Sequence, residues 1–558
     1  MLTPALAATA RRWADDDPDA GDRAAVLDLL QRGGDDPAAA QQLAAWFAEP
    51  LTFGTAGLRG PVRPGPAGMN RAVVRRAAAA LADLLTGERL PTPLPPLVVI
   101  GRDARHGSEA FARDTALVLS GAELRVLSLP RPLPTPVTAF AARQLAADAA
   151  VMVTASHNPA TDNGYKVYLP DAQLVPPHDV VVEAGMRAVG SVLGLALGDG
   201  GELLGEEIVE AYLEATLAAV LGSGRPKARR LRIAVTPLHG VGGELALRVL
   251  TTAGFPAPSI VAEQAEPDPD FPTVAFPNPE EPGAMDAVLA LGERVGAELV
   301  LAVDPDADRL AAAEDGRVFT GDEVGALLAD RALARGRQLV ATTVVSSRLL
   351  ARLAAAAGAP YAETLTGFKW LMRATEPGGT PLGFACEEAL GYAVAPAVVR
   401  DKDGLSAALA LAERAEQLRA AGSSLAGRLD ELARAYGLHV TAQVSVRVPE
   451  LAAITAAMAG LRGQLAGPGG GAPAYLSPAI DLLPEGGPLP PTDAVVLTVA
   501  APDAGPVRVV VRPSGTEPKL KLYLEAVRDA EPDLAAQRAA LRAHLAVVAT
   551  QVRATLAL

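Results

Sequence analysis

The sequence predicts an α/β protein of several domains, from its length, its composition and the pattern of its apolar segments. At roughly 150 residues per domain, the 558 residues correspond to three or four domains. Half of the residues are hydrophobic and a fifth are charged, as in globular proteins. Short apolar runs alternate with longer Ala- and Leu-rich stretches, which is typical of α/β domains rather than of β-sandwiches or helical bundles.

The individual elements follow from this alternation. Strands are predicted for the short apolar runs at 97–100, 150–153, 232–235, 298–303, 339–345 and 507–511. Helices are predicted for the longer stretches at 108–119, 284–296, 321–335, 347–357, 405–420 and 533–550. Each of the first four strands runs into a polar or Gly-rich segment, and such folds place their sites at the carboxyl ends of strands. The Pro- and Gly-rich segment 466–491 is predicted to be a long loop of the last domain.

Charge and composition exclude several classes of protein. The formal net charge of −14 opposes a general attraction to nucleic acid or to an anionic membrane surface. The chain has neither the basic and apolar start of a signal peptide nor an apolar run of the roughly 18 residues that a membrane span needs. The single cysteine, Cys386, cannot form an intrachain disulfide, and it predicts a reducing, cytoplasmic location.

Lysine is rare, since only six of the 50 basic residues are lysines. A lysine is a compact charge that can lose its proton when buried, so a lysine kept in an Arg-rich protein is a candidate for a specific task. Lys227 lies in an Arg-rich stretch and is interpreted as residual surface charge. The other five lysines lie in or near the segments described next.

Three aspartates, Asp304, Asp306 and Asp308, alternate directly after a predicted strand. Three carboxylates this close repel one another unless a cation neutralises them, and oxygen ligands select Mg²⁺, Ca²⁺ or Mn²⁺. A calcium EF-hand is excluded, because Arg309 and Asp315 stand where that loop requires Gly and Glu. A solvated acidic turn is the alternative, and the position after a strand favours the metal site.

A serine in the segment Thr154-Ala155-Ser156-His157-Asn158-Pro159 follows another predicted strand. A serine on such a turn is exposed as a nucleophile would be, although a capped turn explains the same residues. Lys166 comes ten residues later and is a candidate general acid or base, provided that surrounding positive charge lowers its pKa.

Near the C-terminus, Arg512-Pro513-Ser514-Gly515-Thr516-Glu517-Pro518-Lys519 combines two cations, two hydroxyls and a Gly turn. Such a segment makes a phosphate cradle, and a polar hairpin turn is the alternative. Three further segments are suggestive when they are considered together with the aspartate, serine and phosphate-binding segments. They are a Gly-rich loop ending in Arg59, the turn Thr366-Gly367-Phe368-Lys369, and Cys386-Glu387-Glu388-Ala389-Leu390-Gly391. No Gly-Lys dipeptide occurs, so a P-loop is excluded.

These segments together resemble the α-D-phosphohexomutase superfamily of phosphoglucomutases and phosphomannomutases. The resemblance runs from about Thr52 to Tyr523 through TASHNP, DPDADR, GFK, CEEALG and RPSGTEP in a fixed order. FGTAGLRG, NGYKVY, TPLHGVGG and DKDG are similar to the phosphoglucomutase-2-type branch, some of whose members act as phosphopentomutases or make glucose 1,6-bisphosphate.

The resemblance implies a role for each matching residue. Ser156 would carry the phosphoryl group, and Asp304, Asp306 and Asp308, with Ser156, would hold Mg²⁺. The remaining catalytic candidates are Arg59, His157, Lys166 and Arg309. The substrate-binding candidates are Thr366, Gly367, Lys369, Glu387, Ala389, Arg512, Ser514, Gly515 and Thr516.

The resemblance also implies an architecture and an activity. Three similar α/β domains and a smaller C-terminal α+β domain would surround a central cleft, with boundaries expected at 1–205, 206–316, 317–430 and 431–558. The expected activity is phosphoglucomutase-type exchange of sugar 1- and 6-phosphates through phosphoserine, with a sugar 1,6-bisphosphate as activator. The expected partners are small sugar phosphates, without nucleic acid or membrane, for a monomer or homodimer.

One position departs from the family pattern. Many hexose-specific relatives have serine two residues after the first glutamate of the sugar loop, where this chain has Ala389. Phosphopentomutase and phosphomannomutase activities therefore stay open, as do a non-catalytic sugar-phosphate-binding paralogue and a metal-dependent phosphatase.

Overall fold

A computed structural model describes residues 2–54, 57–87, 94–170, 172–222, 228–448, 451–466, 476–484, 489–500, 505–514 and 519–556. The chain forms two units: unit 1 comprises 1–318 and 395–412, and unit 2 comprises 319–394 and 413–558. Among the described residues, no helix has both the length and the apolar character needed to span a bilayer. The domain boundaries expected from the sequence stay predictions.

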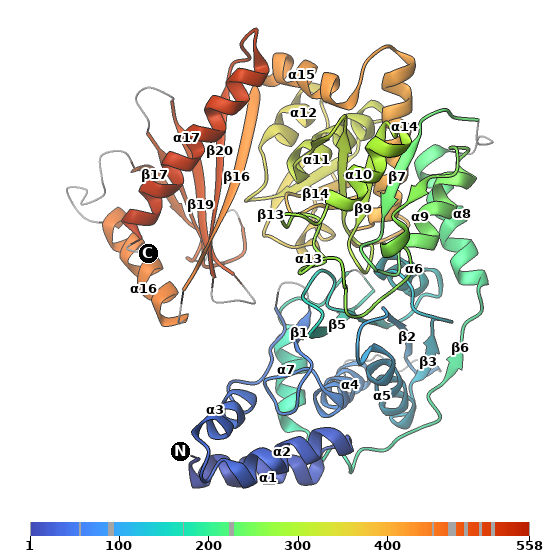
Figure 1. The fold of residues 1–558 in the computed structure, drawn as a ribbon, viewed down its shortest axis with the longest axis vertical. Helices are drawn as coiled ribbons and strands as arrows, with labels where there is room; N and C mark the ends of the chain where they lie inside the picture. The colour runs from blue at the N-terminus through green and yellow to red at the C-terminus, as the bar shows by residue number, and fades with distance from the viewer. Residues whose placement is uncertain are drawn as a thin grey trace. The chain divides into compact units, whose positions relative to one another are not determined.

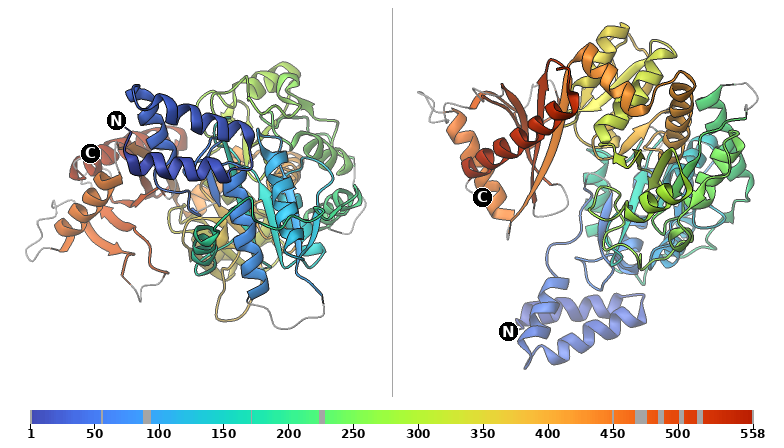
Figure 2. Two further views of the ribbon diagram at one scale, coloured as in Figure 1. Left: turned by 90° about the horizontal axis from the view of Figure 1, so that it is seen from below. Right: turned by 45° about the horizontal axis from the view of Figure 1, so that its top comes forward.

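Unit 1 begins with three helices that the sequence prediction did not include: α1 (Pro4–Asp16), α2 (Ala20–Arg32) and α3 (Pro37–Trp46). Each begins after a side chain that caps its first turn, provided by Thr3, Asp19 and Asp36. The helices lie beside one another (Figure 2) and share a small core that includes Leu29 and Leu43.

The first sheet of unit 1 has the strand order β1-β5-β4-β2-β3-β6. Its strands are β1 (Leu58–Pro61), β2 (Leu97–Arg102), β3 (Arg125–Ser128), β4 (Ala149–Val153), β5 (Asp162–Tyr168) and β6 (Glu202–Leu203). Strands β2, β3, β4 and β6 are parallel, and β5 and β1 continue the sheet in antiparallel pairing. Its helices are α4 (Arg71–Gly87), α5 (Ser108–Gly121), α6 (Thr135–Gln144), α7 (His178–Ala188) and α8 (Glu207–Leu221).

The second sheet of unit 1 has the order β11-β10-β9-β7-β8. Its strands are β7 (Ile233–Thr236), β8 (Ser259–Ile260), β9 (Leu299–Val303), β10 (Leu310–Glu314) and β11 (Arg317–Val318). The helices between them are α9 (Gly243–Thr252), the short 3₁₀ helix η1 (Ala262–Gln264) and α10 (Asp286–Val295). Strand β9 is buried along its whole length, so the loop that follows it starts from the protein interior.

Unit 2 contains a third sheet in the order β13-β12-β14-β15. Its strands are β12 (Leu339–Thr343), β13 (Tyr361–Thr364), β14 (Leu382–Glu387) and β15 (Gly391–Ala393). Its helices are α11 (Gly321–Ala334), α12 (Leu349–Ala357), α13 (Phe368–Leu371) and α15 (Leu425–Tyr436), and α14 (Gly404–Ala420) begins in unit 1 and ends in unit 2. A capping box between Thr320 and Glu323 starts α11.

The fourth sheet is antiparallel and has the order β16-β20-β19-β18-β17 (Figure 1). Its strands are β16 (Leu438–Arg447), β17 (Leu476–Asp481), β18 (Val495–Val499), β19 (Val507–Pro513) and β20 (Lys519–Arg528). Helices α16 (Leu451–Ala466) and α17 (Leu534–Thr555) pack with these strands around one apolar core. The prediction of one long loop at 466–491 is wrong in part, because β17 gains its hydrogen bonds from β18, a partner that the local sequence does not reveal.

Candidate active site

The serine predicted as nucleophile lies in the tight loop after β4. Ser156 has φ +52°, a left-handed conformation that is unfavourable for a residue other than glycine and is held by its surroundings. Its backbone N–H donates to Thr154 Oγ1 at 2.9 Å. Its buried Oγ donates to Asp304 Oδ2 at 2.6 Å and lies 3.1 Å from Nδ1 of His157. The structure therefore joins the serine loop to the first residue of the aspartate triplet.

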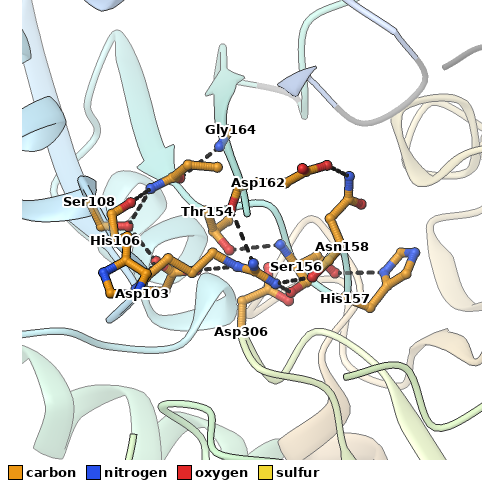
Figure 3. A network of polar contacts seen from close by, with 12 residues as sticks. Asp103, His106, Ser108, Thr154, Ser156, His157, Asn158, Asp162, Gly164 and Asp306 are labelled. Atoms are coloured by element: carbon orange, nitrogen blue, oxygen red, sulfur yellow. Dashed lines mark hydrogen bonds and ion pairs between the residues drawn. The ribbon is translucent and has the colours of Figure 1, made fainter. Parts of the chain in front are cut away.

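A residue that the sequence prediction missed, Arg105, holds the backbone of this serine loop. Its Nη1 donates to the carbonyl oxygens of Pro159 and Asp162 at 2.8 and 3.1 Å. Its Nη2 donates to the carbonyl oxygens of Ser156 and Asn158 at 2.5 and 2.7 Å. One buried guanidinium thus ties together four carbonyls of the loop, and Figure 3 shows the polar network around them. The planar fork of arginine makes this possible.

We expect Arg105→Lys to loosen the serine loop without unfolding the protein. A lysine ammonium has three donors and lacks the planar fork, so it cannot satisfy all four carbonyls. Hydrogen exchange of the amides of Asn158 and Asp162, which bond within this loop, should accelerate by about tenfold, as expected for the loss of a charge-assisted hydrogen bond. Unchanged exchange there would contradict the role of Arg105. The control is Arg102→Lys, at a half-buried residue of the same segment.

The three aspartates occupy the loop after β9 and are fully buried. Each offers a carboxylate oxygen, and these oxygens lie within 4.8 Å of one another. The neighbouring segments approach the loop closely because they carry glycines. A Cβ on Gly240 would lie 2.3 Å from the backbone of Pro305, and one on Gly404 would lie 2.4 Å from the carbonyl oxygen of Arg309. The segments TPLHGVGG and DKDG therefore enclose the aspartates.

Lysines partly neutralise the aspartate cluster. Nζ of Lys166 donates to Asp306 at 2.7 Å and to Asp308 at 2.8 Å, and Nζ of Lys402 lies 3.1 Å from Asp308. Burial alone would raise the pKa of Asp308, but Lys166 and Lys402 outweigh it and lower the pKa. Burial and the two neighbouring carboxylates raise the pKa of Asp304 well above its usual value. Lys402 is a second site residue that the sequence prediction did not assign.

The condition under which Lys166 would act as a general acid or base, a pKa lowered by surrounding positive charge, is not met. Burial does favour the neutral amine, but the carboxylates of Asp306 and Asp308 outweigh burial and raise the pKa of this lysine. Lys166 is therefore a charged, fully buried ammonium in this arrangement.

The aspartate cluster fits a hard divalent cation. Oδ1 of Asp306 and Oδ1 of Asp308 are buried and have no hydrogen-bond partner among the described residues. Buried carboxylate oxygens without a partner are costly, and oxygen ligands of this kind suit Mg²⁺ and similar ions. The observed donor set thus agrees with the metal-binding interpretation of the sequence.

The other residues predicted for this centre lie around the serine and the aspartates. The backbone N–H of Arg309 donates to Asp304 Oδ1 at 3.0 Å, and Nε of Arg309 lies 3.8 Å from Asp308 Oδ1. On β1, Nη1 of Arg59 donates to Asn158 Oδ1 at 3.4 Å. Burial, with Arg309 and Arg59 nearby, lowers the pKa of His157 well below its usual value. Unit 1 therefore brings together all the predicted residues of the phosphoserine centre.

The predicted substrate-binding residues belong to unit 2. Glu387 ends β14 and is buried, and Ala389 is half-buried in the following turn. Thr366 and Gly367 precede α13, which carries Lys369. Arg512 lies on β19, and the backbone N–H of Ser514 donates to the carbonyl oxygen of Lys519 at 2.8 Å. Gly515 and Thr516 lie outside the described residues.

Comparison with known proteins supports the family resemblance that these segments suggested. Four phosphoglucomutase/phosphomannomutase family models match the chain: domain I at 50–190, domain II at 210–317, domain III at 320–436 and the C-terminal domain at 444–542. The chain is 40% identical over 473 residues to a protein of Haemophilus influenzae named "Probable phosphomannomutase", covering 82% of this chain and 93% of that protein. It is 36% identical to the phosphopentomutase of Mus musculus, covering 72% and 70% of the two chains.

A solved structure shows the same fold. The open form of parafusin, a phosphoglucomutase from Paramecium, superposes with a TM-score of 0.69 at 17% identity, covering 91% of this chain and 96% of that one. The predicted architecture of three α/β domains and a C-terminal domain is confirmed. The chain belongs to the phosphoglucomutase/phosphomannomutase family of the α-D-phosphohexomutase superfamily and is a phosphomutase.

Proposed function

We propose that the protein interconverts the 1-phosphate and the 6-phosphate of a hexose through phosphoserine at Ser156. The observation that carries this proposal is the contact between Ser156 Oγ and Asp304 Oδ2 at 2.6 Å, within a buried aspartate cluster. Phosphoryl transfer depends on charge neutralisation and positioning more than on new covalent chemistry. A hydroxyl beside a cluster suited to a divalent cation meets that requirement.

In this proposal, a sugar hydroxyl attacks phosphorus of phospho-Ser156, so that the bond to Ser156 Oγ breaks and a sugar bisphosphate forms. The bisphosphate then turns round, and its other phosphoryl group returns to Ser156 Oγ. Arg309 and Arg59 stabilise the transferring group, and His157 orients the serine oxygen. In the first transfer the proton of the attacking sugar hydroxyl ends on Ser156 Oγ, and in the second the proton of Ser156 Oγ ends on the sugar oxygen that leaves. Lys166 stays a charged ammonium that holds Asp306 and Asp308 in place beside the reacting groups.

We assign the metal to Asp304, Asp306, Asp308 and Ser156, and we propose Mg²⁺. Bound there, Mg²⁺ would supply positive charge against the phosphoryl oxygens. We also propose that Glu387, Lys369 and the segment from Arg512 to Thr516 bind the sugar and its non-reacting phosphate. A sugar 1,6-bisphosphate would prime Ser156 by giving it a phosphoryl group.

A pentose phosphate is the second candidate substrate. Ala389 lacks the hydroxyl of many hexose-specific relatives, and the phosphopentomutase of Mus musculus is among the similar proteins. Ala389 has no hydroxyl that a smaller sugar would leave without a hydrogen-bond partner. The site therefore discriminates less strongly against a pentose phosphate in favour of a hexose phosphate.

The experiment is a comparison of kcat/KM on the 1-phosphates of glucose, mannose, ribose and deoxyribose, with glucose 1,6-bisphosphate present. We expect conversion of at least one to the phosphate at its terminal carbon, with no net release of inorganic phosphate. No conversion of any sugar phosphate would contradict the proposal. Phosphate release in excess of isomerisation would identify a phosphatase instead.

We further propose a cytoplasmic enzyme that is a monomer or a homodimer. The single cysteine, which is buried on β14, supports a reducing compartment.

A further inference from the structure

A loop between η1 and α10 in unit 1 contacts the segment that carries Arg105. This DPDFPT loop has the sequence Asp268-Pro269-Asp270-Phe271-Pro272-Thr273. None of its residues belongs to a motif of the family resemblance. The loop connects elements of the second sheet, whereas Arg105 follows β2 of the first sheet. Contacts between the two therefore join the two sheets of unit 1.

The main contact is made by Phe271, whose ring lies against the guanidinium of Arg105. Cζ of Arg105 lies over this ring, 4.8 Å from its centroid, and both side chains are buried. An aromatic face attracts a cation, and the attraction is larger where water is excluded. Phe271 thus covers the guanidinium that ties together four carbonyls of the serine loop.

The backbone of Phe271 adopts a conformation that is unfavourable for a bulky residue. Its φ is +47°, in the left-handed region. Backbone strain of this kind persists only where the surroundings hold it, and it clusters at functional sites. Ser156 and Ala307, in the serine and aspartate loops, have φ of +52° and +53°. The ring of Phe271 is therefore held over Arg105 at a cost in backbone conformation.

A second contact comes from Asp270, the residue before Phe271. Its Oδ1 lies 2.7 Å from Nε2 of His106, the residue after Arg105. Two consecutive residues of the DPDFPT loop thus contact two consecutive residues beside the serine loop. Asp270 and His106 are both exposed, and an exposed ion pair contributes little. The buried contact of Phe271 is the one that carries the interaction.

The segment after β7 holds the DPDFPT loop at both of its ends. The backbone N–H of Asp268 donates to the carbonyl oxygen of His239 at 3.0 Å, and Nε2 of His239 lies 2.8 Å from Oγ1 of Thr273. The same segment holds the aspartate loop, because the backbone N–H of Val241 donates to the carbonyl oxygen of Pro305 at 2.8 Å. The DPDFPT loop and the aspartate loop are therefore fixed to one segment.

We propose that Phe271 is a positioning residue of the phosphoserine centre: it fixes Arg105 from the second sheet and so keeps the serine loop in place beside the aspartate loop. Phosphoryl transfer requires close alignment of the reacting oxygen, so the placing of this loop matters for the rate. The proposal rests on the proposed function in one respect, since it takes Ser156 as the residue that carries the phosphoryl group. Phe271 acts through Arg105 and not on the substrate.

The test is Phe271→Leu, with hydrogen exchange measured at the amides of Asn158 and Asp162 in the serine loop. Leucine keeps an apolar side chain over Arg105 but has no aromatic face to attract a cation. Exchange of the two amides should accelerate by about fivefold. Unchanged exchange would overturn the proposal. Should this variant fail to fold, Phe271→Met replaces it, because the flexible methionine side chain fills an irregular space without an aromatic ring.

The matched control is Phe255→Leu. Phe255 follows α9, is as buried as Phe271, and has its ring centroid 4.6 Å from Cζ of Arg229. The same substitution there removes an equivalent contact that does not involve the serine loop. Exchange at Asn158 and Asp162 should be unchanged in this variant. Equal acceleration in both variants would show general destabilisation and would overturn the proposal.

A double-mutant cycle with Arg105→Lys tests whether Phe271 acts through Arg105. The serine loop is already loosened in that background, and the lysine ammonium has no planar group to lie against the ring. Phe271→Leu should then accelerate exchange of the serine-loop amides by less than about twofold. A further fivefold acceleration would mean that Phe271 acts by another route, against the proposal.

The kinetic readout tests the consequence for catalysis. We expect Phe271→Leu to lower kcat by about fivefold with KM within about twofold, because the serine oxygen is misplaced while the predicted substrate-binding residues are unaltered. Phe255→Leu should leave both constants unchanged. An unaltered kcat in Phe271→Leu, with Ser156 phosphorylated, would overturn the positioning role. Absence of phosphate from Ser156 in the unaltered protein would instead reject the proposed function, and the exchange experiment would still decide whether Phe271 holds the serine loop.

Discussion

Replacement of Ser156 by alanine is expected to abolish phosphomutase turnover. Loss of the nucleophile of a covalent mechanism lowers kcat by at least about 10⁴-fold. The change removes one oxygen, and alanine has no greater difficulty than serine with the left-handed backbone at this position. Folding should therefore be retained, and the loss should appear in kcat measured with glucose 1-phosphate and glucose 1,6-bisphosphate.

The matched control for this variant is Ser191→Ala, which removes an exposed hydroxyl bonded to Asp16. It should leave kcat unchanged. Mass spectrometry after incubation with the bisphosphate should find phosphate on the peptide that contains Ser156 in the unaltered protein and in the control, but not in Ser156→Ala. Turnover by Ser156→Ala within about tenfold of the unaltered protein would contradict the assignment of the nucleophile.

Replacement of Asp308 by asparagine is expected to lower kcat by about 10³-fold and to weaken Mg²⁺ binding. The variant loses one of three clustered carboxylates, and it leaves Lys166 and Lys402 with one negative partner fewer. Excess positive charge beside the cluster repels a divalent cation and therefore weakens its binding. Titration of activity against Mg²⁺, together with calorimetry of Mg²⁺ binding, measures the two effects separately.

Asp315→Asn is the control for this second variant. Asp315 is exposed in the turn between β10 and β11, and its φ of +50° is tolerated by asparagine. Removing its charge should change neither the Mg²⁺ dependence nor kcat. In the unaltered protein, chelation should abolish turnover and added Mg²⁺ should restore it. An Asp308→Asn protein with unaltered Mg²⁺ dependence would remove Asp308 from the metal site.

Sequence periodicity predicted the buried strands well, because burial on both faces produces continuous apolar runs. The run predicted at 298–303 is β9, Leu299–Val303, and that at 97–100 is β2, Leu97–Arg102. Helices α1 to α3 were missed although Thr3, Asp19 and Asp36 signal their starts. Strand β17 could not be predicted, because its stability comes from pairing with β18 rather than from its own pattern.

The sequence predicted the types of residue that form the candidate site, but not the residues that hold them in place. Arg105 follows a predicted strand, but nothing local shows that its donors reach carbonyls 51 to 57 positions away. Lys402 could have been suspected from the rarity of lysine, and only the fold shows that it lies beside Asp308. Glu388 and Glu525 in unit 2 are similar, since their hydrogen-bond partners, Ser346 and Ser347, are distant in sequence.

The sequence by itself determined which side chains carry the chemistry, because the serine loop, the alternating aspartates and the sugar loop are patterns of consecutive residues that can be recognised without the fold. Only the tertiary structure decided their charge states. Lys166 illustrates the difference: its proton is held by Asp306 and Asp308, which lie 140 and 142 positions away. Electrostatic interaction depends on distance in space and on burial, and neither is set by local sequence.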